Sequence, residues 1–252
     1  MFRFLQTSDI KYLECVPSRV GGSFYEITSK MLTEFSTKLA DHNLKPVSMQ
    51  GLLHNSTKLM LFGSKQSRQK MLELLKRGVE ICNELSIPNL VFGSPKNRKI
   101  PEGLSYEESH EISMDFFSEI GSFAAKHGCK IAIEANAKEY GTNFITNHTE
   151  LFHFISEVNS DGITANFDLS TMILNNENIN QIDEKTIENI SHIHISSPYL
   201  KPMSVPSAEL DNILNTISSF NYDKFVSLEM VGENIKETKE IITNLNKAVI
   251  HA

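Results

Sequence analysis

The stretch KIAIEANAKEYGTNF, residues 130–144, contains a short run of strand-forming residues that ends in a carboxylate. Residues 130–133 alternate as expected of a β-strand, and Glu134 stands where that strand should end. Polar and turn-forming residues follow, which predicts a loop. A carboxylate at the exit of an apolar strand costs free energy unless something charged meets it. The stretch therefore predicts a strand whose last residue needs a partner.

Six other short apolar runs read as strands, namely 10–15, 45–50, 89–93, 163–168, 191–196 and 225–230. Amphipathic helical patterns separate most of them, at 24–43, 67–86, 106–128, 148–160, 207–220 and 234–250. This alternation without a linker-like shift in composition predicts parallel βαβ units in a single domain over residues 1–252.

Two α/β folds fit this alternation, a doubly wound open sheet and a TIM (β/α)₈-type barrel. No G-x-G-x-x-G or G-x-x-x-x-G-K-[ST] turn occurs in the sequence, which weakens the nucleotide-binding open sheets. Polar and ionisable residues recur at the strand ends, where barrel enzymes keep their sites, so the barrel is favoured. Only nine residues precede the first clear strand and they resemble the end of a helix, so we expect seven strands, with the first barrel strand lacking at the N-terminus.

Composition narrows the class of protein. The 252 residues are 40% hydrophobic and 22% charged, which is ordinary for a soluble globular chain. The net charge of −7 argues against a broad nucleic-acid surface, and no apolar run is long enough for a membrane span. Three scattered cysteines without paired spacing favour reduced thiols in a cytoplasmic protein. A homodimer stays an open alternative.

The last four predicted strands carry an ionisable residue at or near their ends: Glu134, Asp168, His194 and Glu229. In a barrel these ends lie side by side around one mouth. One acidic strand end alone is more often a helix cap or a salt-bridge partner, but four on consecutive strands favour a shared role. Three carboxylates and one imidazole suit one divalent metal ion, Mn²⁺ first, with Mg²⁺, Co²⁺ or Zn²⁺ as alternatives.

Further polar residues are expected around the same mouth as substrate contacts. Arg suits a carboxylate or phosphate, and a strand-end amide suits a hydroxyl. The alternatives are a loop-capping amide at Gln50 and a solvated basic loop around residues 96–99. We interpret Glu14 as structural, with the alternative that it orients Arg98 or a ligand. His192 is interpreted as a residue behind His194 that packs in the interior or supports a ligand. The predicted substrate contacts are Gln50, Lys96, Arg98, Asn136 and Lys201.

The chain resembles the xylose isomerase-like TIM-barrel superfamily, the sugar phosphate isomerase/epimerase and AP endonuclease family 2 type. The resemblance rests on LVFGSPKNR (90–98), IEANAKEYGTNF (133–144), IHISSPYLKP (193–202) and VSLEM (226–230), and on the order Glu, Asp, His, Glu along the last four strands. It implies a metal-dependent isomerase or epimerase of a small carbohydrate. Glu134 and Glu229 would then exchange a proton through an enediolate, while all four residues hold the metal.

Three positions depart from the pattern of ketose epimerases in this superfamily. Thr171 replaces a histidine, Ser197 an acid and Leu200 an arginine, which argues against a free-ketose epimerase. Thr171 and the net charge also argue against an endonuclease IV-like DNA repair function. A metal-dependent dehydratase or lyase acting on a keto sugar or inosose, or a catalytically impaired scaffold, stay as alternatives.

Overall fold

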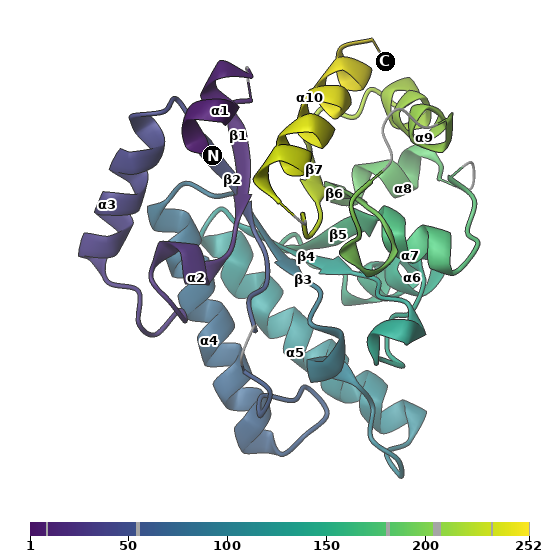
Figure 1. Cartoon of the computed structure of the whole chain (residues 1–252). Coiled ribbons are helices and arrows are strands. Elements are labelled where there is room, and N and C mark those ends of the chain that lie inside the picture. The colour runs from purple at the N-terminus through teal and green to yellow at the C-terminus, as the bar shows by residue number, and fades with distance from the viewer. Residues whose placement is uncertain (9, 54–55, 180–181, 204–207, 233, 252) are drawn as a thin grey trace.

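The protein is described by a computed structural model that covers residues 1–8, 10–53, 56–179, 182–203, 208–232 and 234–251 (Figure 1). Seven parallel strands lie side by side in chain order. They are β1 (Tyr12–Cys15), β2 (Lys45–Met49), β3 (Asn89–Phe92), β4 (Lys130–Glu134), β5 (Ile163–Asp168), β6 (Ile190–Ser196) and β7 (Phe225–Glu229).

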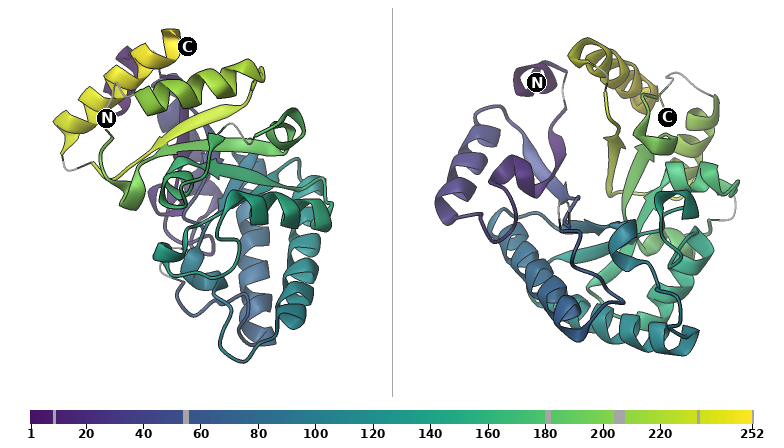
Figure 2. Two further views of the ribbon diagram at one scale, coloured as in Figure 1. Left: turned by 90° about the vertical axis from the view of Figure 1, so that its right-hand side faces the viewer. Right: turned by 60° about the horizontal axis from the view of Figure 1, so that its bottom comes forward.

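Helices connect the strands and lie on the outside of the sheet (Figure 2). They are α1 (Phe2–Thr7), α2 (Pro17–Val20), α3 (Ser29–Ala40), α4 (Lys65–Glu84), α5 (Tyr106–Lys126), α6 (His148–Val158), α7 (Leu169–Leu174), α8 (Glu184–Glu188), α9 (Ala208–Ser219) and α10 (Ile235–His251), with short 3₁₀ turns η1 (Pro95–Arg98), η2 (Lys138–Tyr140) and η4 (Pro198–Leu200). The predicted TIM-barrel architecture is confirmed.

The sheet curls into a nearly closed barrel whose two end strands are β1 and β7. The described residues contain no backbone pairing between these two strands. The rings of Tyr12 and Phe225 meet there with centroids 4.9 Å apart. On the outside, α1 and α10 contact each other, with the Lys239 Nζ 5.1 Å from the centroid of the Phe4 ring. The predictions of seven strands and of a helix before the first one are confirmed for the described residues.

One predicted helix is shorter in the structure, and short helices, α7 among them, were not predicted. The predicted helix 24–43 is shortened to α3, which begins after Thr28, whose side chain accepts a hydrogen bond from the Met31 N–H. Phe24 and Ile27 are buried but precede the helix, so their apolar spacing reflects packing and not helical turns. Helix α7 was not predicted, because its six residues are too few for a helical period to show.

The core between sheet and helices is apolar, whereas the barrel interior includes polar side chains. Helix α4 buries a stripe on its sheet-facing side that consists of Met71, Leu72, Leu74, Leu75, Val79, Ile81 and Cys82. Inside the barrel, Asn89 donates a hydrogen bond to Ser48, and Ser191 donates one to Asn89. These hydrogen bonds satisfy polar groups that would otherwise be costly to bury.

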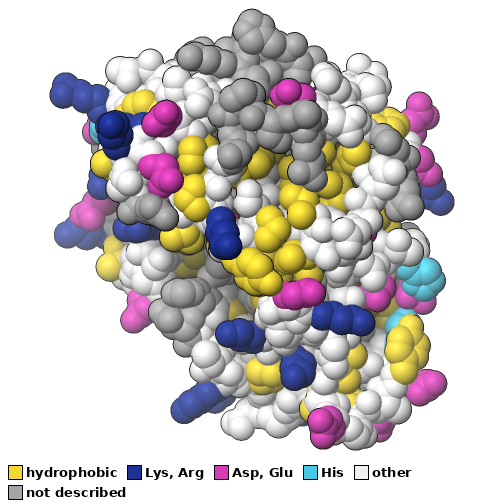
Figure 3. Space-filling view, turned by 45° about the vertical axis from the view of Figure 1, so that its right-hand side comes forward, with side chains coloured by type: hydrophobic (Ala, Val, Ile, Leu, Met, Phe, Trp, Pro, Cys, Tyr) yellow, Lys and Arg dark blue, Asp and Glu magenta, His cyan; other side chains and the backbone are white. Residues whose placement is uncertain are grey.

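The surface carries charges of both signs. The face in Figure 3 shows acidic and basic side chains interspersed, without a field of one sign, around hydrophobic side chains that gather near its centre. Within the described part of the chain, every helix is too short or too polar to cross a lipid bilayer.

Gly162 sets how closely α5 approaches the start of β5, the strand that carries Asp168. A Cβ atom on Gly162 would lie 1.9 Å from the backbone oxygen of Gly121 in α5, and backbone atoms cannot yield as a flexible side chain can. We expect Gly162→Ala to lower the free energy of unfolding by about 3 kcal/mol. Urea denaturation followed by circular dichroism measures this.

The matched control is Gly103→Ala, where an added Cβ meets no atom within 4 Å. Gly103 has a φ of +86°, so alanine there costs about 1 kcal/mol through backbone strain alone. An equal loss of stability in both variants would contradict the proposed close approach of α5 and β5.

Candidate functional site

Strands β4 to β7 bring four ionisable residues to the same end of the barrel. Glu134 and Asp168 are the last residues of β4 and β5, and Glu229 is the last residue of β7. The parallel register places Asp168 beside His194, and it places Ser196, two residues further along β6, beside Glu229. Because all four side chains lie at the carboxyl ends of the strands, the structure gathers the predicted ligand set in one place.

His194 is at the centre of this cluster and is fully buried. Its Nδ1 atom lies 3.2 Å from Glu134 Oε2 and 3.3 Å from Glu229 Oε2. Its Nε2 atom lies 2.9 Å from Oε2 of Glu14. Burial lowers the pKa of His194, but the charge of Glu14 and hydrogen bonds to the surrounding carboxylates outweigh burial and raise this pKa well above its ordinary value.

Glu134 accepts hydrogen bonds from two side-chain amide groups. Asn136 donates a hydrogen bond of 2.5 Å to Oε1, and Asn166 donates one of 2.7 Å to Oε2. Burial raises the pKa of Glu134, but the hydrogen bond and charge of His194, the Asn136 amide and the Arg98 charge lower it below its ordinary value. Gly93 leaves room for this carboxylate, since a Cβ there would lie 2.9 Å from Oε1.

Asp168 accepts two hydrogen bonds through its two carboxylate oxygens. Its Oδ1 accepts the backbone N–H of Thr171 at the start of α7, and its Oδ2 accepts the Ser196 hydroxyl at 2.5 Å. Burial, followed by the charge of Glu134, raises the pKa of Asp168 from 3.8 to about 7, although His194 and Ser196 act in the opposite direction. Crowded carboxylates therefore resist full ionisation here unless a cation neutralises them.

Arg98 and Asn136 lie behind Glu134. Arg98 is fully buried, and its Nη2 donates to the Glu134 backbone oxygen at 2.6 Å and to Asn136 Oδ1 at 2.8 Å. Burial lowers the pKa of Arg98 to about 10. Its Nε and Nη1 atoms have no hydrogen-bond partner among the described residues. This guanidinium thus fixes the backbone that presents Glu134.

The other three predicted substrate contacts lie at different depths. Gln50 is partly buried and donates a hydrogen bond of 3.0 Å to Glu14. Lys96, in η1, and Lys201, after η4, are both exposed.

Two tyrosines join the loops that follow β4 and β6. The hydroxyl of Tyr140 lies 2.5 Å from the Ser170 hydroxyl and accepts the Tyr199 backbone N–H at 2.9 Å. Tyr199 is 57% exposed and has a φ of 61°, which is an unusual conformation for a residue other than glycine. Ser170 in turn donates its N–H to Ser196, the hydroxyl that bonds Asp168. Two serines, Ser170 and Ser196, therefore connect Tyr140 to Asp168.

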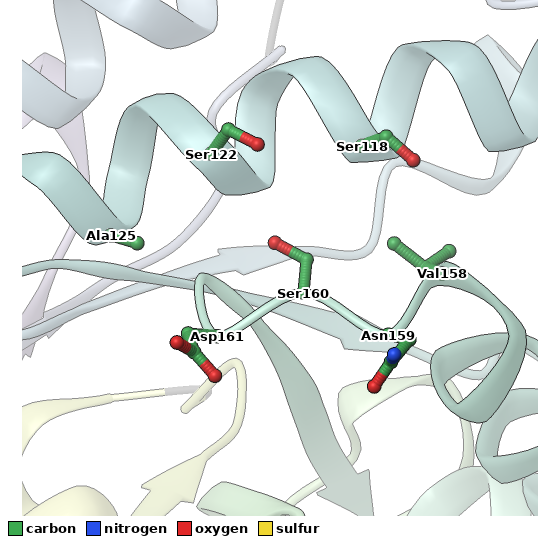
Figure 4. A pocket seen from close by; sticks show the side chains of 7 residues that line it. All are labelled: Ser118, Ser122, Ala125, Val158, Asn159, Ser160 and Asp161. Atoms are coloured by element: carbon green, nitrogen blue, oxygen red, sulfur yellow. The ribbon is translucent and has the colours of Figure 1, made fainter.

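A separate pocket lies at the other end of β5, between α5 and the loop that leads into this strand (Figure 4). Its lining consists of Ser118, Ser122, Ala125, Val158, Asn159, Ser160 and Asp161. The pocket contains none of the four clustered ionisable residues, so the carboxyl ends of the strands remain the candidate site.

The donor set at the strand ends fits a divalent cation. Ligand atoms of Glu134, Asp168 and His194 all lie within 4.8 Å of one another, and Glu229 contacts the same His194 nitrogen as Glu134. Carboxylate oxygens with one imidazole are ligands that Mn²⁺, Mg²⁺ and Co²⁺ accept. Burial and, after it, the negative charge of Glu134 raise the pKa of Asp168, and a cation bound here would offset both effects.

Comparison with known proteins identifies the family to which this architecture belongs. Residues 2–248 match the family model described as a xylose isomerase-like TIM barrel. The chain belongs to this family. No curated protein sequence matches the chain.

Solved structures share the xylose isomerase-like barrel at low sequence identity. The apo 3-keto-D-glucoside 4-epimerase of E. coli has a TM-score of 0.78 and 15% identity, covering 98% of this chain and 92% of that one. D-psicose 3-epimerase of Clostridium cellulolyticum H10, solved with D-tagatose, has a TM-score of 0.80 and 12% identity, and the match covers 99% of this chain and 91% of that one. AP endonuclease family 2 of Brucella melitensis has a TM-score of 0.75 and 18% identity, and the match covers 94% of this chain and 89% of that one. At these identities the likeness shows the fold.

One contributor to the site was not predicted from the sequence, and the role of a second was left open. Asn166 is fully buried and contacts both Glu134 and His194, with Nδ2 distances of 2.7 Å and 3.1 Å. Its position two residues before Asp168 on β5 places both on the same face of the strand, a signal that could have identified it. Glu14 was interpreted as structural, with the orientation of Arg98 or a ligand as the alternative, because nothing in the sequence indicates that its side chain reaches β6 across the barrel.

The raised pKa of Asp168 predicts a pH dependence of stability for chelator-treated protein. The folded state holds this proton up to about pH 7, whereas an unfolded aspartate loses it near 3.8. The stabilising contribution of Asp168 is therefore complete at low pH and is lost as the pH rises to about 7. We therefore expect the free energy of unfolding of Asp168→Asn to rise relative to that of wild type between pH 4 and pH 8. The expected rise is at least about 1.4 kcal/mol, which corresponds to a pKa difference of one unit.

Thermal unfolding with chelator at a series of pH values measures this difference. Asp161→Asn removes an exposed carboxylate remote from the cluster and serves as the control, for which we expect no such trend. A constant difference between Asp168→Asn and wild type across this range would contradict the described crowding of carboxylates.

Proposed function

We propose that this protein is a divalent-metal-dependent isomerase or epimerase of a sugar or sugar phosphate, and that it transfers a proton through an enediolate. The observation that carries this proposal is the placement of two glutamates, from β4 and β7, against the same nitrogen of His194. Asp168 lies in the adjoining position on β5. Two carboxylates next to one buried centre suit the removal of a proton and its return.

Glu134, Asp168, His194 and Glu229 are the proposed metal ligands, with Mn²⁺ as the first candidate and Mg²⁺, Co²⁺ or Zn²⁺ as alternatives. A bound divalent cation would act as a Lewis acid on a substrate carbonyl oxygen and lower the energy of the adjacent carbanion. Asp168 and His194 hold positions fixed by neighbouring hydroxyl and carboxylate groups. Such fixed ligands favour a defined coordination geometry.

Glu134 and Glu229 are the proposed acid and base. One carboxylate removes the proton from the carbon beside the carbonyl, and the other delivers a proton to the opposite face or to the neighbouring carbon. Delivery to the opposite face gives epimerisation, and delivery to the neighbouring carbon gives isomerisation. The lowered pKa of Glu134 keeps it ionised at neutral pH, as a base requires.

The five predicted substrate contacts contribute in two ways under this proposal. Lys96 and Lys201 are exposed cations in the loops after β3 and β6, suited to an anionic group such as a phosphate. Arg98 and Asn136 hold Glu134, and Gln50 holds Glu14, so their proposed contribution to substrate binding is through these carboxylates. The 3-keto-D-glucoside and D-psicose epimerases with the same fold support a carbohydrate as the substrate class.

A reducing compartment suits the thiols of this chain. Cys15, Cys82 and Cys129 are all free and buried. Free thiols are typical of cytoplasmic proteins, where disulfides are rare. We therefore propose a cytoplasmic enzyme that acts on a small molecule.

The reaction predicts exchange of one carbon-bound hydrogen with solvent. We expect Mn²⁺-loaded protein in D₂O to incorporate deuterium beside the carbonyl of at least one member of a panel of keto sugars and their phosphates, as followed by ¹H NMR. Incorporation together with a new epimer or isomer supports the proposal, whereas water loss from the substrate would identify a dehydratase. The absence of exchange across the panel, with Mn²⁺ bound, would contradict the proposed proton transfer.

Replacing one of the two proposed proton-transfer groups tests the roles of the glutamates. We expect Glu229→Gln to reduce the rate of exchange by at least about 10²-fold, because general acid–base catalysis is worth that much. Glu139→Gln, which changes an exposed carboxylate in η2 near the same mouth, is the matched control and should retain the wild-type rate. Equal rates in all three proteins would exclude the two-glutamate mechanism.

A further inference from the structure

Glu14 occupies the interior of the barrel, although it belongs to the end strand β1. Its side chain is 7% exposed, and its carboxylate faces two histidines that lie two residues apart on β6 and therefore on one face of that strand. Oε2 lies 2.9 Å from Nε2 of His194, and Oε1 lies 3.6 Å from Nε2 of His192. Glu14 thus reaches across the barrel from one end strand to the strand next to the other.

The environment of Glu14 fixes its orientation. Gln50, which follows β2, donates a hydrogen bond of 3.0 Å to Oε2. The pairing of β1 with β2 is irregular between Leu13 and Glu14, whose partners are Pro46 and Ser48. A register irregularity of this kind re-aims the side chain next to it. These two features direct the carboxylate of Glu14 toward β6.

The two ring nitrogens of His194 face different groups. Nδ1 faces Glu134 and Glu229, two of the proposed metal ligands, whereas Nε2 faces Glu14. The side-chain amide of Asn166 also lies 3.1 Å from Nδ1, where an amide N–H can donate only to a nitrogen without a proton. Among the described residues, Nε2 has no partner that meets the angular criteria of a hydrogen bond. Its close polar neighbour is the carboxylate of Glu14, at ion-pair distance. A neutral imidazole carries one proton, and it can bind a metal only through the other nitrogen.

We propose that Glu14 is a positioning residue for the metal centre, which keeps the proton of His194 on Nε2 and leaves the Nδ1 lone pair directed toward Glu134 and Glu229. This inference rests on the proposed function, because it presupposes a metal at that site. An ionised carboxylate has no proton to donate and can only accept hydrogen bonds. It therefore favours the histidine tautomer that is protonated on the nitrogen nearer to the carboxylate. A carboxylate behind a ligating histidine fixes the ring and strengthens it as a ligand.

A second cation between Glu14 and the two histidines is the competing use of this cluster. Ligand atoms of Glu14, His192 and His194 lie within 4.8 Å of one another. Two cations would share His194 only if its ring lost both protons, and His192 Nε2 is already 2.8 Å from the Ser227 hydroxyl. The positioning role requires neither the loss of both protons from His194 nor the release of His192 from Ser227.

The affinity for Mn²⁺ tests this inference. Chelator-treated protein is titrated with Mn²⁺ at pH 7.5, and free Mn²⁺ is followed by electron paramagnetic resonance. We expect wild type to bind one Mn²⁺ per chain and Glu14→Gln to bind one Mn²⁺ with roughly 10- to 100-fold weaker affinity. Glutamine keeps the size of the side chain, but its amide group can also donate to Nε2 and so favour the tautomer that cannot bind through Nδ1.

The matched control is Glu177→Gln. Glu177 Oε2 lies 2.7 Å from Nδ1 of His148, a buried carboxylate–histidine pair that includes none of the four proposed ligands. We expect this variant to keep the wild-type affinity for Mn²⁺. Equal affinities in Glu14→Gln and wild type, or an equal loss in both variants, would overturn the positioning role. Two Mn²⁺ in wild type and one in Glu14→Gln would overturn it in favour of a second cation site, whereas a wild type that binds no Mn²⁺ would remove the proposed function itself.

A measurement on the wild-type protein keeps the inference testable if Glu14→Gln fails to fold. Protein with ¹⁵N-labelled histidine is loaded with diamagnetic Zn²⁺, and the His194 signals are assigned by their loss in His194→Gln. We expect the Nε2 of His194 to show the chemical shift and coupling of a protonated nitrogen and Nδ1 to show that of a metal ligand. A proton on Nδ1 with Zn²⁺ bound would overturn the proposal.

Discussion

The convergence of carboxylates on the buried imidazole of His194 is the interaction on which the rest of the site depends. Glu14, Glu134 and Glu229 each contact a ring nitrogen, and Asp168 lies beside the ring on the neighbouring strand. Such an arrangement is expensive in a barrel interior, because buried charges of one sign repel one another. Burial first, and then the charge of Glu134, raise the pKa of Asp168, and a bound divalent cation would lower this cost.

The same interaction connects the site to the closure of the barrel. The end strands β1 and β7 share no backbone pairing in the described residues, so side chains make the connections there. Tyr12 meets Phe225 between the two end strands, while Glu14 reaches the histidines of β6. Because Glu14 spans this region and also faces His194, the arrangement of β1 and the orientation of a proposed metal ligand are physically linked.

The sequence predicted the strand ends well but not the groups behind them. Glu134, Asp168, His194 and Glu229 were recognisable because each ends or nearly ends a short apolar run, and parallel strands bring such ends together. Arg98 was expected to contact substrate, whereas its burial and its hydrogen bond to the Glu134 backbone depend on how η1 folds over β4, which local pattern does not encode. The contact between Glu14 and His194 depends on the curvature of the whole sheet, which a local sequence pattern does not encode. Helix α7 is too short for a helical period to show in the sequence.

The most direct measurement of the central claim is a crystal structure of the protein with Mn²⁺, in which anomalous diffraction locates the metal independently of the protein atoms. The account predicts one anomalous peak per chain, about 2.0–2.6 Å from carboxylate oxygens of Glu134, Asp168 and Glu229 and from Nδ1 of His194. A peak at another place in the chain, or no peak at a saturating concentration of Mn²⁺, would contradict it.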